Sequence, residues 1–102
     1  MKYEIIDGAA GPTLVLRDQL TFADRDLFDG VIDRLLARRS PAVAVDLGGL
    51  EYMDSAGLGM LLTLRDRADA SQAAVRLLHP RGEVKDLLEL ACFDTLFAIG
   101  ES

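Results

Sequence analysis

Residues on which many protein chemistries depend are scarce in this sequence. It contains one cysteine and one histidine among 102 residues. The single cysteine, Cys92, excludes a disulfide within the chain and fits a reducing compartment. Zinc centres are built mainly from several Cys and His ligands, and this chain has too few of both. We therefore expect no metal site.

Long apolar runs and positive charge are also lacking. No apolar run approaches the roughly 18 residues that a membrane-spanning helix needs, and residues 1–4 lack the apolar core of a signal peptide. Lys and Arg number 11 against 17 Asp and Glu, which gives a net charge of −6. An acidic chain repels the phosphates of nucleic acids and of anionic membranes. We expect a soluble, cytoplasmic protein with no nucleic-acid partner and no membrane insertion.

What is present is one domain's length of chain, of which half the residues are apolar, so residues 1–102 are expected to form a single domain. Short apolar runs bounded by turn residues predict five strands, at 3–6, 13–17, 42–47, 73–78 and 95–99. Helical apolar spacing predicts three helices, at about 22–39, 55–69 and 80–91. The ββαβαβαβ order predicts an α/β fold with a mixed sheet of four or five strands. The first two strands form an antiparallel hairpin, and the helices pack mainly on one face.

Some local expectations follow from single residues. Thr21 is a plausible helix N-cap with Asp24 completing a capping box, and Leu27 begins the apolar stripe of the first helix. Pro80 suits the first turn of the third helix. The strand at 42–47 is expected to be covered on both faces, and 48–54 to be a loop. Cys92 is expected to be buried rather than a reactive thiol, and 100–102 to be a frayed tail.

One segment, from Leu47 to Gly59, gathers unusual residues between a predicted strand and a predicted helix. Ser55 falls where that helix begins, so a phosphate on its hydroxyl would meet unpaired backbone N–H groups and the positive end of the helix dipole. The small residues after it would let another protein approach closely. The alternative is that Asp54 or Ser55 is an ordinary N-cap and the glycines only permit tight packing. Tyr52 and Met53 are expected to anchor the segment to the core.

Catalytic readings of the same residues are weaker. Gly57-Leu58-Gly59 lacks the pattern and the lysine of a phosphate-binding loop. Ser55 and His79 could be drawn into a triad with an aspartate, but Ser55 lacks the G-x-S-x-G elbow. We therefore expect that the protein is not an enzyme.

The run L-G-G-L-E-Y-M-D-S-A-G-L-G resembles the signature of STAS domains, specifically the bacterial anti-sigma factor antagonists. The segment from Val84 to Phe93 also resembles this family, and the predicted element order agrees with its fold. The resemblance implies that Ser55 is the phosphoacceptor. It implies a partner-binding surface made of five neighbouring residues: Asp54, Ala56, Gly57, Leu58 and Gly59.

The resemblance also implies partners. The unphosphorylated domain would bind an anti-sigma factor that is a serine kinase of the histidine-kinase-like ATPase fold. Phosphorylation would release it, and a metal-dependent serine phosphatase would reset the switch. ATP and the metal ion belong to these partners, so the resemblance implies no cofactor for this chain. An alternative within the family is a scaffold subunit of a stress-signalling assembly or of a lipid-transport ATPase complex. Two positions depart from the family pattern: Ala56 replaces a frequent Ser or Thr, and Thr21 replaces an acid for which Asp24 or Asp26 could substitute.

Overall fold

The computed structural model describes residues 1–100, so 101 and 102 of the expected frayed tail lie outside the described residues, while Gly100 belongs to the last strand. Residues 1–100 form ten elements, where η marks a short 3₁₀ helix: β1 (Lys2–Ile6), β2 (Thr13–Leu20), η1 (Phe22–Asp24), α1 (Arg25–Leu36), β3 (Ala42–Met53), α2 (Ser55–Ala70), β4 (Ala74–Leu78), α3 (Gly82–Leu90), η2 (Phe93–Thr95) and β5 (Ala98–Gly100). The predicted ββαβαβαβ order is confirmed.

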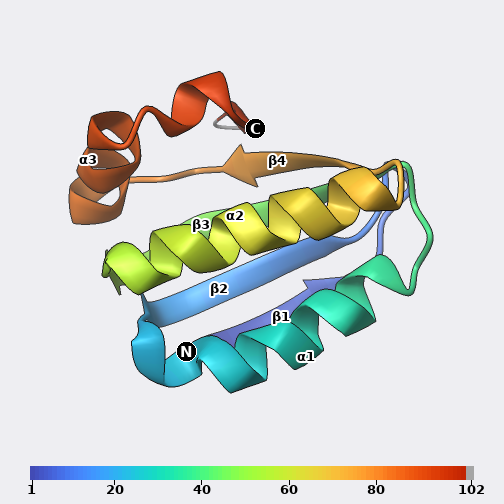
Figure 1. The fold of residues 1–102 in the computed structure, drawn as a ribbon, viewed down its shortest axis with the longest axis horizontal. Helices are drawn as coiled ribbons and strands as arrows, with labels where there is room; N and C mark the ends of the chain where they lie inside the picture. The colour runs from blue at the N-terminus through green and yellow to red at the C-terminus, as the bar shows by residue number, and fades with distance from the viewer. Residues whose placement is uncertain (101–102) are drawn as a thin grey trace.

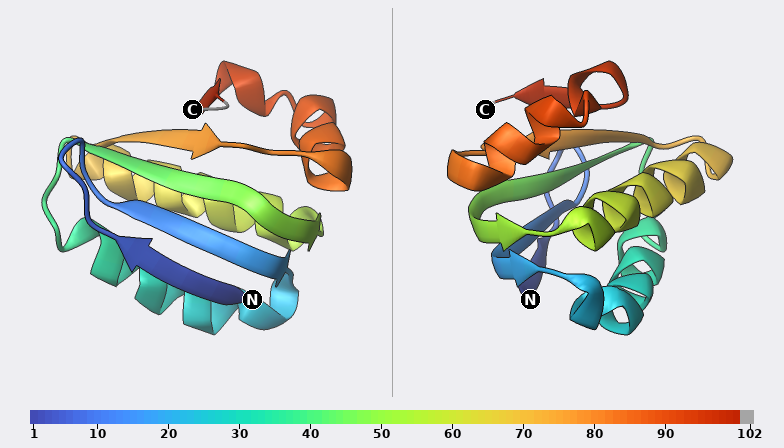
Figure 2. Two further views of the ribbon diagram at one scale, coloured as in Figure 1. Left: turned by 180° about the vertical axis from the view of Figure 1, so that it is seen from behind. Right: turned by 60° about the vertical axis from the view of Figure 1, so that its left-hand side comes forward.

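The strands form one mixed sheet in the order β1-β2-β3-β4-β5. β1 and β2 pair antiparallel, as predicted, and the other neighbours pair in parallel. Helices α1 and α2 lie side by side on one face of the sheet (Figure 1). Seen from behind, the opposite face of β1 to β4 has no helix over it, and α3 lies beyond the end of β4 (Figure 2). The prediction that the helices pack mainly on one face is therefore correct.

The core lies between this face and the two helices. Successive side chains of a strand point to opposite sides of the sheet. In β2, Leu14 and Leu16 are fully buried in the core, whereas Thr13 and Val15 lie on the open face and are partly exposed. α1 contributes an apolar stripe at helical spacing: Phe28, Val31, Ile32 and Leu35. Among the described residues no polar or charged residue is buried. Removal of apolar surface from water is therefore the main source of stability.

The expectation that residues 42–47 are covered on both faces is wrong. Val43, Val45 and Leu47 are buried against the helices, whereas Ala44 and Asp46 on the other face remain partly exposed. Crossovers to α1 and α2 leave the sheet on the same side, so no helix covers the second face of β3. Ala44 and Asp46, whose side chains lie on this face, are a small and a charged residue, and both tolerate partial exposure.

The predicted loop at 48–54 is mostly strand, because β3 continues to Met53. Val15 pairs with Asp46, Arg17 with Gly49 and Gln19 with Tyr52, so β3 advances three residues at each step where β2 advances two. These two β-bulges change the inward spacing, and Leu50 and Met53 follow Leu47 into the core at intervals of three. The bulged strand therefore reaches the start of α2 with only one residue in between.

Three further expectations need correction. Pro80 precedes α3 rather than lying in its first turn, because Arg81 is the N-cap. Cys92 is exposed, not buried: it follows the end of α3 in a left-handed conformation (φ 58°), and its N–H donates to the carbonyl of Glu89. Residues 93–95 form η2, so the last strand begins only at Ala98.

Leu27 and Phe28, two adjacent residues of α1, allow a test of which side of this helix faces the core. Phe28 is fully buried, whereas Leu27, predicted on the same stripe, is 46% exposed. Phe28→Ala should lower the free energy of unfolding by about 3 to 5 kcal/mol, because it leaves a cavity in a packed core. Leu27→Ala should change it by less than about 1 kcal/mol. Urea denaturation of both variants checks this, and similar losses at the two sites would contradict the packing of α1.

Candidate functional site

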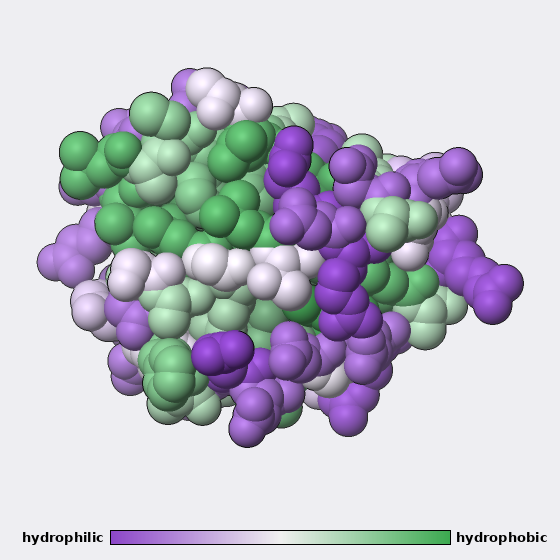
Figure 3. All heavy atoms as spheres, viewed as in Figure 1, coloured by the Kyte–Doolittle hydropathy of each residue, from purple (hydrophilic) through white to green (hydrophobic). Residues whose placement is uncertain are grey.

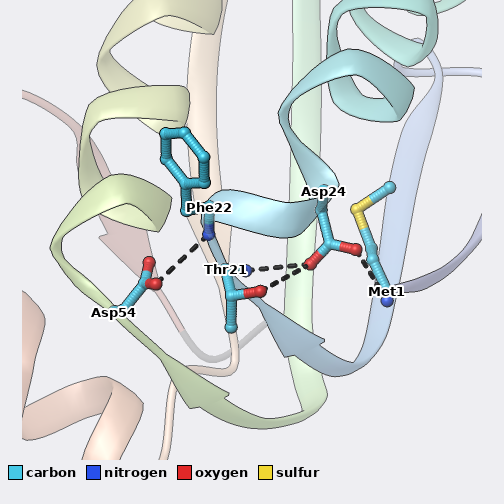
Figure 4. Close-up of polar contacts among 5 residues, drawn as sticks. All are labelled: Met1, Thr21, Phe22, Asp24 and Asp54. Atoms are coloured by element: carbon cyan, nitrogen blue, oxygen red, sulfur yellow. Dashed lines mark hydrogen bonds and ion pairs between the residues drawn. The ribbon is translucent and has the colours of Figure 1, made fainter.

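The junction between β3 and α2 is organised by the carboxylate of Asp54. Asp54 is the N-cap of α2, and its Oδ1 accepts a hydrogen bond from the N–H of Gly57 at 2.9 Å. Its Oδ2 accepts from the N–H of Phe22 in η1 at 3.2 Å (Figure 4). The carboxylate thus satisfies one of the unpaired donors of α2 and ties α2 to the segment after β2. Of the two N-cap candidates, Asp54 is the one that caps the helix.

Ser55 is the first residue of α2 and is exposed. Its hydroxyl makes no hydrogen bond with any described residue, since the neighbouring carboxylate already caps the helix. The oxygen is therefore free to react or to be contacted from solvent. The next residue toward the N-terminus is Asp54, and both oxygens of its carboxylate already accept hydrogen bonds from backbone N–H groups.

Gly57 has a structural role that the sequence motif alone does not reveal. It is buried, and a Cβ placed on it would lie 2.4 Å from Cγ of Met53 and 2.7 Å from the carbonyl oxygen of Leu20. Only glycine lets the first turn of α2 lie this close to the ends of β2 and β3. Gly59, by contrast, is exposed, and a Cβ there would meet no heavy atom within 4 Å. The two glycines of the motif therefore serve different purposes.

The predicted partner-binding residues are brought together but are not equally accessible. Ala56 and Leu58 are partly exposed and Gly59 is exposed, while Gly57 lies beneath them. Met53 is buried, as expected of an anchor, but Tyr52 is not an anchor, since it is 47% exposed. Tyr52 is the first of two positions at which the described residues show an exposed aromatic side chain.

The second such position is Phe22, which sequence reasoning missed. Phe22 is 65% exposed, and the guanidinium of Arg25 lies 5.5 Å from its ring centroid. A groove of about 480 Å³ separates η1 and α1 from the first turns of α2. Seven residues line it: Phe22, Arg25, Asp29, Ala56, Gly59, Met60 and Thr63. An aromatic residue directly after the N-cap, outside the helical stripe, was the available signal.

Asp24 holds the corner between β2 and η1 (Figure 4). Its carboxylate accepts from the N–H of Thr21 at 2.9 Å and pairs with the N-terminal ammonium of Met1 at 3.1 Å. Burial acts to raise the pKa of this carboxyl, but these hydrogen bonds and the ammonium charge outweigh it and lower the pKa below 3.8. The expected pairing of Thr21 and Asp24 is thus present. Of the two acids that could substitute for the one replaced by Thr21, Asp24 is engaged internally, whereas Asp26 is exposed.

The described residues contain no group of three or more His, Cys, Asp or Glu side chains placed to hold a metal ion. None of their helices combines the length and apolar character required to cross a bilayer.

This fold, a mixed five-stranded sheet with α1 and α2 on one face, defines a class of small α/β domain. Residues 7–99 match the family described as "Mlab, STAS domain". The chain belongs to the STAS domain family. It is 44% identical over 55 residues to a STAS-domain containing protein of Pseudomonas aeruginosa, and the match covers 54% of each chain. The match thus spans about half the length of this relative.

Solved structures show the same fold at low identity. An anti-sigma factor antagonist from Mycobacterium paratuberculosis superposes with a TM-score of 0.86 at 17% identity, over 99% of this chain and 86% of that one. The Bacillus cell fate determinant SpoIIAA in its phosphorylated form gives a TM-score of 0.71 at 14% identity, over 96% and 90%. The predicted membership of the STAS domain family is therefore confirmed, and the likeness to anti-sigma factor antagonists is one of fold.

The two glycines give a matched test of the junction. Gly57→Ala should lower the free energy of unfolding by about 1 to 3 kcal/mol, because the added methyl would overlap Met53 and the backbone of β2. Gly59→Ala should be neutral or raise it by up to about 1 kcal/mol, since alanine favours the helix. Urea denaturation measures both. Equal effects would mean that α2 does not approach β2 as closely as described.

Asp24 gives a test in pH. Because its pKa in the folded state lies below the unfolded value, its contribution to stability is present above about pH 4 and is lost as the pH falls through the folded pKa. Asp24→Asn should therefore destabilise the protein by about 1 kcal/mol at pH 7, and this difference should shrink below pH 3.8. Asp26→Asn, at an exposed neighbour, is the control and should change the stability at pH 7 by less than about 0.5 kcal/mol in thermal unfolding.

Proposed function

We propose that this domain is an anti-sigma factor antagonist-like switch, which binds a protein kinase partner while Ser55 is unmodified and releases it once Ser55 is phosphorylated. The observation that carries the proposal is the exposed, unbonded hydroxyl of Ser55 on the first turn of α2. An exposed serine on a rigid strand–helix junction can enter the active site of a kinase. SpoIIAA, a structural neighbour, has been solved in a phosphorylated form.

The electrostatic consequence of phosphorylation follows from the position of Asp54. Phosphate adds about −1.5 to −2 charges at neutral pH, directly beside a carboxylate that is held in place by Gly57 and Phe22. The exposed N–H groups of the first turn can receive part of that charge, so the fold tolerates it. A partner that covers Ser55 would instead have to bury the phosphate and the carboxylate together, which is costly unless it supplies cations.

The docking surface of the switch would centre on Ser55 and on the small residues that follow it. Ala56 and Gly59 offer little bulk, so a partner can contact the backbone of α2. Phe22 stands on the far side of the adjoining groove as an exposed aromatic anchor, a residue type common at binding hot spots. Gly57 would contribute indirectly, because it lets the first turn of α2 lie close to the ends of β2 and β3.

The partner of this proposal is a serine kinase of the histidine-kinase-like ATPase fold that also acts as an anti-sigma factor. The kinase would supply ATP and its metal ion, and a metal-dependent serine phosphatase would remove the phosphate. The domain itself would catalyse no reaction. It would act in the cytoplasm by binding to the kinase or dissociating from it.

Charge at Ser55 should decide binding. Ser55→Asp should weaken affinity for the purified kinase by at least about tenfold, which corresponds to only ~1.4 kcal/mol. Ser55→Ala should bind as the unmodified protein does and should abolish phosphorylation by the kinase. Isothermal titration calorimetry measures the affinities, and phosphopeptide mass spectrometry locates the modified residue.

The matched control is Ser71→Asp, which places the same charge at the exposed C-cap at the other end of α2. It should leave the affinity unchanged. Equal affinities for Ser55→Asp and the unmodified protein would refute the switch and would favour the scaffold role.

A further inference from the structure

The face of the sheet that carries no helix has a hollow with charged walls. Figure 3 shows that the side bearing the helices has a broad apolar area. The opposite side, seen from behind in Figure 2, has no helix over β1 to β4. There a hollow of about 490 Å³ lies across β2, β3 and the segment after β4. We call it the open-face hollow, and its lining includes Arg17, Asp46, Gly48, Gly49, His79 and Arg81.

A β-bulge forms the floor of this hollow. β3 advances three residues, from Asp46 to Gly49, where β2 advances two, so Gly48 lies within the bulge. A Cβ on Gly48 would lie 3.1 Å from Oδ1 of Asp46. A Cβ on Gly49 would lie 3.1 Å from Cγ of Arg17. Because neither residue has a side chain, the backbone of β3 is open to a ligand at this point.

Gly48 also holds two opposite charges in place. Its N–H donates to Oδ1 of Asp46 at 2.9 Å, and its carbonyl accepts from Nε of Arg81 at 2.7 Å. Each contact fixes a side chain through one atom, so the second carboxylate oxygen and the two Nη groups can meet a ligand. Within residues 1–100, neither side chain forms an ion pair, with the other or with a third residue. An anchored anion and an anchored cation thus lie in one hollow without neutralising each other.

Arg17 adds a second guanidinium on the β2 side of the hollow. It pairs with Glu4 at 3.3 Å, but the two side chains are 51% and 53% exposed, and such surface pairs contribute little. The guanidinium of Arg17 can therefore turn to a ligand, and its planar donors suit a carboxylate. The lining as a whole provides two guanidinium groups and one carboxylate.

We propose that the open-face hollow binds a free acidic amino acid. Such a ligand carries two carboxylates and one ammonium, which is the charge complement of two guanidinium groups and one carboxylate. Its α-carboxylate would meet Arg81, its ammonium would meet Asp46, and its side-chain carboxylate would meet Arg17. A phosphate dianion fits less well, because it brings no donor for Asp46 and is repelled by that carboxylate.

The proposal is independent of the switch at Ser55, because the hollow lies on the face of the sheet away from α2. The experiment follows the backbone amides of Gly48 and Gly49 in ¹H–¹⁵N NMR spectra of the full chain while L-glutamate is added at constant ionic strength. Three compounds, each lacking one group, are the matched controls. Glutarate lacks the ammonium, γ-aminobutyrate lacks the α-carboxylate, and L-alanine lacks the side-chain carboxylate.

We expect L-glutamate to shift these two amides saturably, and each control compound to bind at least about tenfold more weakly. Asp46→Asn should weaken L-glutamate about tenfold and bring it level with glutarate, because the amide oxygen of Asn can still accept from Gly48. Arg81→Gln should also weaken it about tenfold. Arg65→Gln is the matched control and should change nothing, since Nε of Arg65 likewise donates to a backbone carbonyl, that of Leu96 at 2.8 Å, outside the hollow.

Several results would overturn the proposal. They are an absence of saturable shifts at Gly48 and Gly49, equal affinities for L-glutamate and glutarate, and inorganic phosphate binding more tightly than L-glutamate. Unchanged affinity in Arg81→Gln would also refute it. The same spectra show whether each variant is folded, and if Arg81→Gln is not, Arg17→Gln decides instead, because it should remove the preference for L-glutamate over L-alanine. Ser55→Asp should leave the affinity unchanged, so this proposal and the switch can fail separately.

Discussion

The arrangement of the candidate site depends on one close contact, between the first turn of α2 and the ends of β2 and β3. The contact exists because residue 57 has no side chain, so Met53 and the carbonyl of Leu20 occupy the space that a Cβ would need. Asp54 then reaches both the N–H of Gly57 and the N–H of Phe22. Steric closeness and two hydrogen bonds together fix the start of the helix, and with it the direction in which Ser55 faces.

The same contact sets the position of α2 relative to η1 and α1. The groove between them is lined by Phe22 from η1 and by Ala56 and Gly59 from α2. Ser55 directly precedes Ala56 and is exposed on the first turn of the helix. The STAS domain family, to which the chain belongs, supplies the scaffold that holds these residues.

Much of this could be predicted from the sequence, where local pattern determines the structure. Helical spacing located α1 and α2, and the special residues between Leu47 and Gly59 indicated the exposed position of Ser55. The predictions failed where the local structure depends on a residue that is distant in the sequence. The bulges of β3 arise from its pairing with β2, and the need for glycine at 57 arises from Leu20. Cys92 lies just after α3 in a left-handed backbone conformation and is exposed there. Glycine is the residue that usually indicates this kind of helix end, so a cysteine gave no such signal in the sequence.

The wholly apolar interior has a consequence for how such a protein can be controlled in a cell. No described polar or charged group is sealed inside, so apart from Asp24 little in the interior responds to a change in ionisation outside it. In the switch proposed above, a phosphate on Ser55 would change what the surface attracts or repels while the apolar core that holds the fold stays as it is. Repeated addition and removal of that phosphate would then leave the lifetime of the protein against proteases largely unchanged.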